Sequence, residues 1–226
     1  MSTNKYAIIV AGGSGSRMGT DIPKQFLPVA GMPVLMHTLL KFQSYSSSLQ
    51  IILVLPENQM QAWESLCKKY SFEVVHEIVK GGNSRFQSVS NGLNAIHDLN
   101  GLVAIHDGVR PFVSKEIIEN SFEVAEELGN AIVSVSMKDS IRMVEGEKSV
   151  AVDRSAYSII QTPQTFKVSL IKKAFKVPEL LSFTDDASVL EHYGEKINLI
   201  EGSYKNIKIT TPEDMLLAEA IISHLS

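Results

Sequence analysis

The chain has 226 residues, of which 44% are hydrophobic and 20% are charged, and its formal net charge is −4. This composition is typical of a folded globular protein and excludes an intrinsically disordered chain, while the length suits a single domain over residues 1–226. The negative balance argues against a nucleic-acid surface, and no apolar run reaches the length of a membrane span.

Short apolar runs alternate along the chain with longer segments of helical periodicity. We expect strands at about 6–11, 50–55, 72–79, 102–106, 131–136 and 196–200. Helical patterns fill the gaps and begin near Pro33, Glu57, Ser84, Ser114 and Thr211. The alternation predicts an α/β fold of Rossmann-like type, with a largely parallel sheet flanked by helices. Ligands of such sheets bind outside the carboxyl ends of the strands, so the residues after each strand are the candidate site.

The first predicted strand is followed by the glycine-rich stretch AGGSGSRMGTDIPKQ, residues 11–25. Glycines in such a turn allow backbone N–H groups to come close to an anion. The nucleoside-triphosphatase and dinucleotide-binding patterns do not fit, because no Lys-Ser or Lys-Thr pair follows and Met18 replaces the third glycine of G-x-G-x-x-G. We expect a phosphate cradle in which the nucleotide-binding residues are Ala11, Gly12, Gly13 and Gly15.

Two cations distinguish this loop from an ordinary phosphate cradle. Arg17 lies inside the loop, and Lys24 follows seven residues later, directly after Pro23, which stiffens the chain. A cradle with two fixed cations indicates chemistry on the phosphate.

Polar and glycine residues also follow later predicted strands. The Gly81-Gly82 pair precedes a helix with Ser88, whose hydroxyl could reach a base or a ribose. After the fourth strand comes HDGVRPF, in which Asp107 could hold a divalent cation or a sugar hydroxyl, or could cap a turn. His106 is interpreted as structural rather than as a base. Further candidates downstream are Arg110, Arg154, Thr162 and Lys208.

Residues 137–152, MKDSIRMVEGEKSVAV, break the βα alternation. They read as two short alternating runs around Glu145-Gly146-Glu147, which predicts a β-hairpin. A hairpin that leaves its domain needs a surface to lie against, and a second subunit is the simplest partner. We therefore expect this arm to mediate dimerisation.

Ten strings, in order along almost the whole chain, carry a resemblance to one family. They are AGGSGSRM, PKQFL, GGNSR, HDGVRP, KDS, VDR, QTPQ, TDDAS, EG followed by NIKIT, and TPED. Together they resemble the 2-C-methyl-D-erythritol 4-phosphate cytidylyltransferases of the non-mevalonate isoprenoid pathway. The resemblance implies transfer of CMP from CTP to the phosphate of methylerythritol phosphate, with release of pyrophosphate, by in-line attack without a covalent intermediate.

The resemblance also implies roles for individual residues. Arg17 and Lys24 would stabilise the α-phosphate, and Arg154 and Lys208 would hold the attacking phosphate. Mg²⁺ would bridge the triphosphate of CTP; no cluster of side chains has metal-ligand spacing, so a metal is expected to arrive with the nucleotide. Asp107 would contact the sugar hydroxyls or this metal. The remaining substrate-binding residues would be Arg110, Ser140 and Thr162.

In the family the arm crosses a two-fold axis, which implies a homodimer in which Ser140 and Arg154 complete the partner's site. Ser140 stands where the family commonly has threonine, which keeps the hydroxyl but loses a methyl contact. Thr211 stands where relatives can carry arginine.

Three alternatives stay open from the sequence. Ribitol-5-phosphate cytidylyltransferase shares several of the strings, although VDR and TDDASVLEHYG favour methylerythritol phosphate. A dinucleotide-binding oxidoreductase requires an acidic residue about 20 residues after the loop, and Glu57 comes much later. A non-catalytic nucleotide-binding module would not need cations from three separated segments.

Cysteine usage and the N-terminus bear on location. The single cysteine, Cys67, excludes a disulfide framework and favours a reducing compartment, and we interpret it as a buried small apolar residue. The N-terminal residues MSTNKYAIIV are too short an apolar stretch for a signal peptide. A cytoplasmic protein without nucleic-acid or membrane partners is expected.

Overall fold

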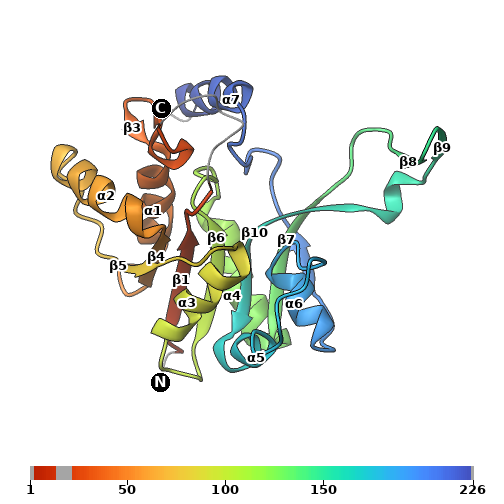
Figure 1. The fold of residues 1–226 in the computed structure, drawn as a ribbon, viewed down its shortest axis with the longest axis horizontal. Helices are drawn as coiled ribbons and strands as arrows, with labels where there is room; N and C mark the ends of the chain where they lie inside the picture. The colour runs from red at the N-terminus through yellow and green to blue at the C-terminus, as the bar shows by residue number, and fades with distance from the viewer. Residues whose placement is uncertain (1–2, 14–21, 225–226) are drawn as a thin grey trace.

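A computed structural model describes residues 3–13 and 22–224. Its centre is a seven-stranded sheet in the order β11-β7-β10-β6-β1-β4-β5 (Figure 1). The strands are β1 (Lys5–Val10), β4 (Gln50–Leu55), β5 (Glu77–Lys80), β6 (Leu102–Asp107), β7 (Asn130–Ser136), β10 (Ser158–Lys167) and β11 (Leu199–Glu201). Only β10 pairs antiparallel with its neighbours among these described strands, and the other pairings are parallel. The predicted α/β class with a largely parallel sheet is confirmed.

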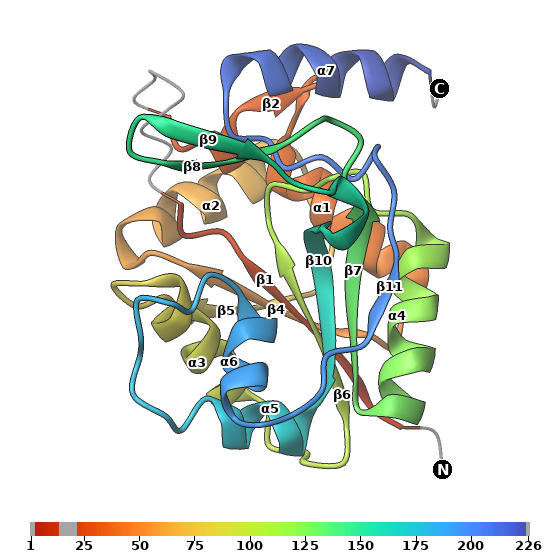
Figure 2. The ribbon, with the colours of Figure 1, turned by 90° about the vertical axis from the view of Figure 1, so that its right-hand side faces the viewer.

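Helices cover both faces of this sheet, as Figure 2 shows for α4 on one side and α3 with α6 on the other. One face packs against α1 (Val34–Tyr45), α2 (Glu57–Lys69) and α4 (Lys115–Leu128). The other face packs against α3 (Arg85–Ala95), α5 (Val168–Ala174) and α6 (Asp186–His192). Because helices cover the central strands on both faces, the side chains of these strands are apolar at successive positions. Such continuous apolar runs are what predicts these strands from the sequence.

The helix α7 (Pro212–Ser223) lies outside these two layers. It packs with the small ribbon of β2 (Pro28–Val29) and β3 (Met32–Pro33) on a third apolar cluster that contains Ile209 and Ala218. A capping box between Thr211 and Asp214 begins the helix, with Pro212 in the first turn. The start predicted from Thr211-Pro212-Glu213-Asp214 is therefore confirmed, and this cap fixes the segment just before it, which carries Lys208.

The segment between β7 and β10 projects from the body of the protein as an arm (Figure 1). It contains β8 (Arg142–Glu145) and β9 (Lys148–Ala151), which pair antiparallel around a turn where Gly146 has a positive φ of 58°. Every residue of both strands is exposed. The hairpin expected within residues 137–152 is present, and its role in dimerisation stays a prediction.

Two sheet segments differ from the expectations. The predicted strand at 72–79 is shorter, because residues 72–76 lie against α2, where the Trp63 indole donates to His76 at 2.9 Å. The strand β10 was not predicted, because buried polar residues such as Gln164 and Thr165 interrupt its apolar pattern.

The helix expected near Ser84 begins there, with Ser84 as its N-cap, and ends at Ala95. None of the described helices is long and apolar enough to cross a membrane.

Candidate active site

A pocket lies at the carboxyl ends of β1 and β6, where the sheet rule places ligands. Among its described lining residues are three cations and one carboxylate, Lys24, Arg85, Lys208 and Asp107. The chain as a whole has a net charge of −4, so this positive surplus is local. Such a pocket attracts a polyanion.

The first glycine loop forms one wall of the pocket through Ala11, Gly12 and Gly13. Lys24 lies in a 3₁₀ turn, Lys24–Phe26, and is only 8% exposed. The neighbouring Gln25 amide donates to the Ala11 carbonyl at 2.8 Å and thereby ties this turn to the loop. The structure thus brings Lys24 to the predicted cradle. Gly15 and Arg17 lie outside the described residues.

The second glycine loop forms the opposite wall. The Gly82 N–H donates to the Ser88 hydroxyl at 3.1 Å, and both residues line the pocket. A Cβ atom on Gly82 would lie 2.3 Å from the Gln87 Cβ, so no side chain fits there. Ser88 therefore holds the loop in place, in addition to the ligand contact expected from the sequence.

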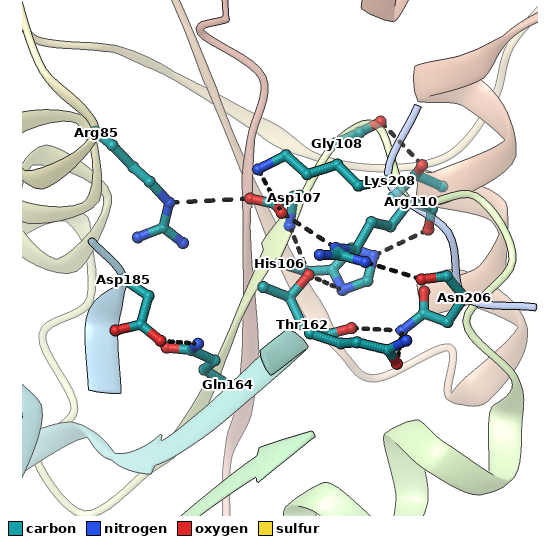
Figure 3. Close-up of polar contacts among 12 residues, drawn as sticks. Arg85, His106, Asp107, Gly108, Arg110, Thr162, Gln164, Asp185, Asn206 and Lys208 are labelled. Atoms are coloured by element: carbon teal, nitrogen blue, oxygen red, sulfur yellow. Dashed lines mark hydrogen bonds and ion pairs between the residues drawn. The ribbon is translucent and has the colours of Figure 1, made fainter. Parts of the chain in front are cut away.

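Asp107, at the end of β6, is the centre of the charged network (Figure 3). Its Oδ2 lies 3.0 Å from the Lys208 Nζ and 3.2 Å from the Arg110 Nε, and its Oδ1 lies 3.9 Å from the Arg85 Nε. Burial alone would raise the pKa of Asp107, but the charges of Lys208, Arg85 and Arg110 together hold that pKa well below its usual range. The carboxylate is therefore ionised at neutral pH.

Arg85 is a pocket residue that sequence reasoning missed. Its two terminal nitrogens donate to the two oxygens of Asp186 at 2.6 and 2.7 Å, a bidentate pair across 101 residues of sequence. Burial lowers the pKa of Arg85, but the Asp186 charge more than offsets it, so the pKa is raised overall. The strings GGNSR and TDDAS were noticed in the sequence, but nothing in either predicts that they pair.

His106 and Thr162 lie directly behind Asp107. The Thr162 hydroxyl accepts the Asp107 backbone N–H at 3.1 Å, and His106 is fully buried. Burial lowers the pKa of His106 to about 4, so the imidazole is neutral at physiological pH. A buried ring facing away from the pocket fits the structural interpretation of His106.

The Arg110 guanidinium makes two contacts within the protein. Besides Asp107, it donates to the Asn206 carbonyl at 2.8 Å and so links the turn after β6 to the segment that carries Lys208. Arg110 and Thr162 lie next to the pocket, but neither is among its described lining residues.

Ser140 and Arg154 lie on the exposed arm, and neither lines the pocket. Arg154 donates to the Lys138 carbonyl within the arm itself. Within the part of one chain that the structure describes, these two predicted substrate contacts are not brought to the other site residues.

The donor set limits how a metal could be held. Among residues 3–13 and 22–224 there is no group of three His, Cys, Asp or Glu side chains that could hold an ion. Asp107 Oδ1 faces Arg85 at 3.9 Å, beyond hydrogen-bond distance, whereas Oδ2 has two close cations. The described residues could therefore supply a cation with one ligand, Asp107 Oδ1. Its other ligands would have to come from a bound molecule.

A mainly parallel sheet with glycine loops and fixed cations at its carboxyl edge defines a nucleotide-binding α/β protein. The family model of 2-C-methyl-D-erythritol 4-phosphate cytidylyltransferase matches residues 6–224. The chain belongs to this family.

Individual relatives agree with this assignment. The protein of that name from Phocaeicola vulgatus is 48% identical over 219 residues, which cover 97% of this chain and 100% of the relative. The one from Clostridium novyi is 44% identical and covers 100% of this chain and 99% of its own. These matches favour the methylerythritol phosphate expectation over the ribitol phosphate alternative.

Solved structures give the same result for the fold. The 4-diphosphocytidyl-2C-methyl-D-erythritol synthase of Anaerococcus prevotii superposes with a TM-score of 0.83 at 31% identity, covering 98% of this chain and 96% of that one. The 2-C-methyl-D-erythritol 4-phosphate cytidylyltransferase of Thermus thermophilus gives 0.79 at 29% identity, covering 98% and 100%.

Proposed function

We propose that the protein transfers CMP from CTP to the phosphate of 2-C-methyl-D-erythritol 4-phosphate, which releases pyrophosphate. The observation that carries this proposal is the pocket at the edge of the sheet, which is lined by two glycine loops together with Lys24, Arg85 and Lys208. Membership of the cytidylyltransferase family supplies the identity of the two substrates.

The chemistry explains the kind of side chains found. A phosphate monoester has a second pKa of about 6 and is mostly dianionic at neutral pH, so its attack needs no general base. The barrier arises because two anions must meet in line while charge builds on the α-phosphate and on the departing pyrophosphate. Fixed cations lower this barrier, and the pocket supplies them.

The cations divide between the two substrates. Lys24, beside the first glycine loop, and Arg17 would stabilise the α-phosphate as its charge increases. Lys208, which contacts Asp107 Oδ2, would hold the attacking phosphate together with Arg154. The two glycine loops would bind the triphosphate and the nucleoside of CTP, with Ser88 at the second loop.

A divalent cation fits this site as a companion of CTP. When bound, Mg²⁺ would neutralise part of the triphosphate charge, with Asp107 as its protein ligand. The contacts of Asp107 with the exposed Lys208 and the buried Arg110 keep its carboxylate ionised and fixed in orientation, whether it binds the metal or a sugar hydroxyl.

The arm provides the missing half of the acceptor site in this proposal. Its strands expose apolar side chains, including Met143 at 57%, Val144 at 70% and Val150 at 53%. Exposed apolar residues on a two-stranded arm favour burial against a second copy of the chain. In such a homodimer, Ser140 and Arg154 of one chain would reach the pocket of the other.

The direct test is an assay of pyrophosphate release with CTP, Mg²⁺ and one of two acceptors. Methylerythritol phosphate is expected to support turnover. Turnover with ribitol 5-phosphate alone would replace the proposed acceptor, and no turnover with either would favour a protein that only binds nucleotide.

A further inference from the structure

Behind Asp107 the hydrogen bonds form a closed circuit of four residues (Figure 3). The Asp107 N–H donates to the Thr162 Oγ1 at 3.1 Å, and the Thr162 Oγ1 lies 3.0 Å from the His106 Nδ1. The His106 Nε2 lies 3.0 Å from the Arg110 carbonyl, and the Arg110 Nε lies 3.2 Å from Asp107 Oδ2. All four residues are buried.

The direction of donation around this circuit is fixed by elimination. A carbonyl oxygen can only accept, so the His106 Nε2 must carry the hydrogen that goes to Arg110. The neutral imidazole then has a bare Nδ1, which can only accept, so the Thr162 hydroxyl must donate to it. Thr162 accepts from the Asp107 N–H with its remaining lone pairs. The direction of each hydrogen bond in the circuit therefore determines the direction of the next one.

Helix α1 packs against His106 and against the turn that follows it. The Phe42 ring packs edge-on against the imidazole at 4.9 Å, and the Thr38 hydroxyl of the same helix donates to the Gly108 carbonyl at 3.0 Å. The turn after β6 is thereby held from α1 on one side and from β10 on the other. His106 contacts both of these elements, through Phe42 of α1 and Thr162 of β10.

We infer that His106 is a positioning residue of the acceptor half of the site. It acts through Thr162 on the Asp107 backbone and through the Arg110 carbonyl on the Arg110 guanidinium, and so sets where Lys208 is held. Lys24 and the glycine loops do not belong to this circuit. Loss of His106 is therefore expected to weaken binding of the acceptor phosphate more than binding of CTP.

The kinetic test uses two substitutions that each keep one half of the circuit. His106→Asn keeps an acceptor near the position of Nδ1 for Thr162, and His106→Gln keeps a donor near the position of Nε2 for Arg110. Each should raise the KM for methylerythritol phosphate about tenfold, the effect of one buried hydrogen bond, and should change the KM for CTP by less than about twofold. Equal changes in both KM values, or a lower Tm with both KM values unchanged, would overturn the inference.

Double variants separate the circuit from a direct substrate contact of Thr162. Thr162→Val already breaks the link to His106, so adding His106→Gln should raise the acceptor KM little further, whereas adding His106→Asn should add its full effect. Full additivity in both double variants would contradict the circuit. His37→Gln is the matched control, because His37 is a half-buried histidine of α1 that contacts the Val29 carbonyl at 2.8 Å, away from the pocket. It should leave both KM values unchanged.

A measurement on the unsubstituted protein tests the circuit even if no His106 variant folds. The ¹⁵N spectrum of the histidine side chains should show His106 as a neutral ring with its hydrogen on Nε2, and Thr162→Val should shift its Nδ1 resonance. A hydrogen on Nδ1, or no response to Thr162→Val, would overturn the inference. The kinetic measurements rest on the proposed function, whereas the spectrum is recorded without substrate. Absence of turnover by the wild-type protein would therefore count against the proposed function alone.

Discussion

The pocket around Asp107 and the arm around Arg154 hold their charged side chains in different ways. Asp107 is buried and contacted by three cations that come from α3, from the turn after β6 and from the segment before α7. The arm exposes every residue of its two strands, and Arg154 contacts only the arm's own backbone among the partners described for it. The charged side chains of the pocket are held by contacts within one chain, whereas those of the arm are exposed, and burial of the arm by a second chain stays a prediction.

The largest effect is expected from Lys24, on the organised side of this comparison. Lys24→Ala removes a buried cation that the proposed function places beside the attacked phosphate, so it should lower kcat by about a hundredfold or more, with the fold intact. Steady-state kinetics and a thermal melt measure the two quantities. Lys80→Ala, at an exposed lysine paired with Glu57, is the control and should leave kcat unchanged. An active Lys24→Ala protein would remove Lys24 from the mechanism.

Mixing two inactive variants tests whether the arm serves a second chain. In the proposed function, Lys208→Ala should lower activity through the pocket and Arg154→Ala through the arm, each by about a hundredfold. If the arm acts on its partner, random mixed dimers contain one intact site, and the mixture should recover about a quarter of wild-type activity. An arm that acts on its own chain predicts no recovery.

The glycine loops give a smaller effect that separates ligand contact from folding. A Cβ on Gly12 would have its nearest neighbour at 3.9 Å, whereas one on Gly82 would meet the Gln87 Cβ at 2.3 Å. Gly12→Ala should therefore leave Tm unchanged but raise the KM for CTP about tenfold, because the proposed function places the nucleotide in that space. Gly82→Ala should also destabilise the fold, by about 1–3 kcal/mol. An unchanged KM for CTP in Gly12→Ala would argue against the cradle.

No effect on activity is expected at Cys67, which belongs to neither region. Burial, with a smaller contribution from Glu64, raises the pKa of this thiol to about 11. At pH 8 only about one thiol in a thousand is ionised, and iodoacetamide should react slowly and leave turnover unchanged. Intact-mass spectrometry beside the activity assay measures both. Rapid alkylation at pH 8 would show that the thiol is more acidic than its burial implies.

The parts of the fold that the sequence could predict are those governed by local pattern. The buried parallel strands β1, β4 and β6 are continuous apolar runs, and the caps at Ser114 and Thr211 lie within a few residues of the helices they begin. By contrast, β10 was missed because its buried polar residues find their partners in other segments: Gln164, for example, donates to Asp185 and accepts from Ala187.

The candidate site divides in the same way. Glycine loops and strand-end residues such as Lys24 and Asp107 could be proposed from their position after a strand. The contact of Arg85 with Asp186 could not, because it joins residues 101 positions apart whose meeting depends on how α3 and α6 share one face of the sheet. The exposure of Arg154 likewise becomes visible only when the arm is seen to leave the sheet.

The contact between Lys208 and Asp107 has a consequence for the pace of successive turnovers. In the proposed function, an arriving phosphate must compete for the Lys208 ammonium with the Asp107 carboxylate that already contacts it, so the net attraction is smaller than for a lysine without that contact. The same carboxylate recaptures the ammonium when the diphosphate product departs. We therefore expect the pair to shorten the time that either molecule resides on the protein, which favours rapid release over tight retention.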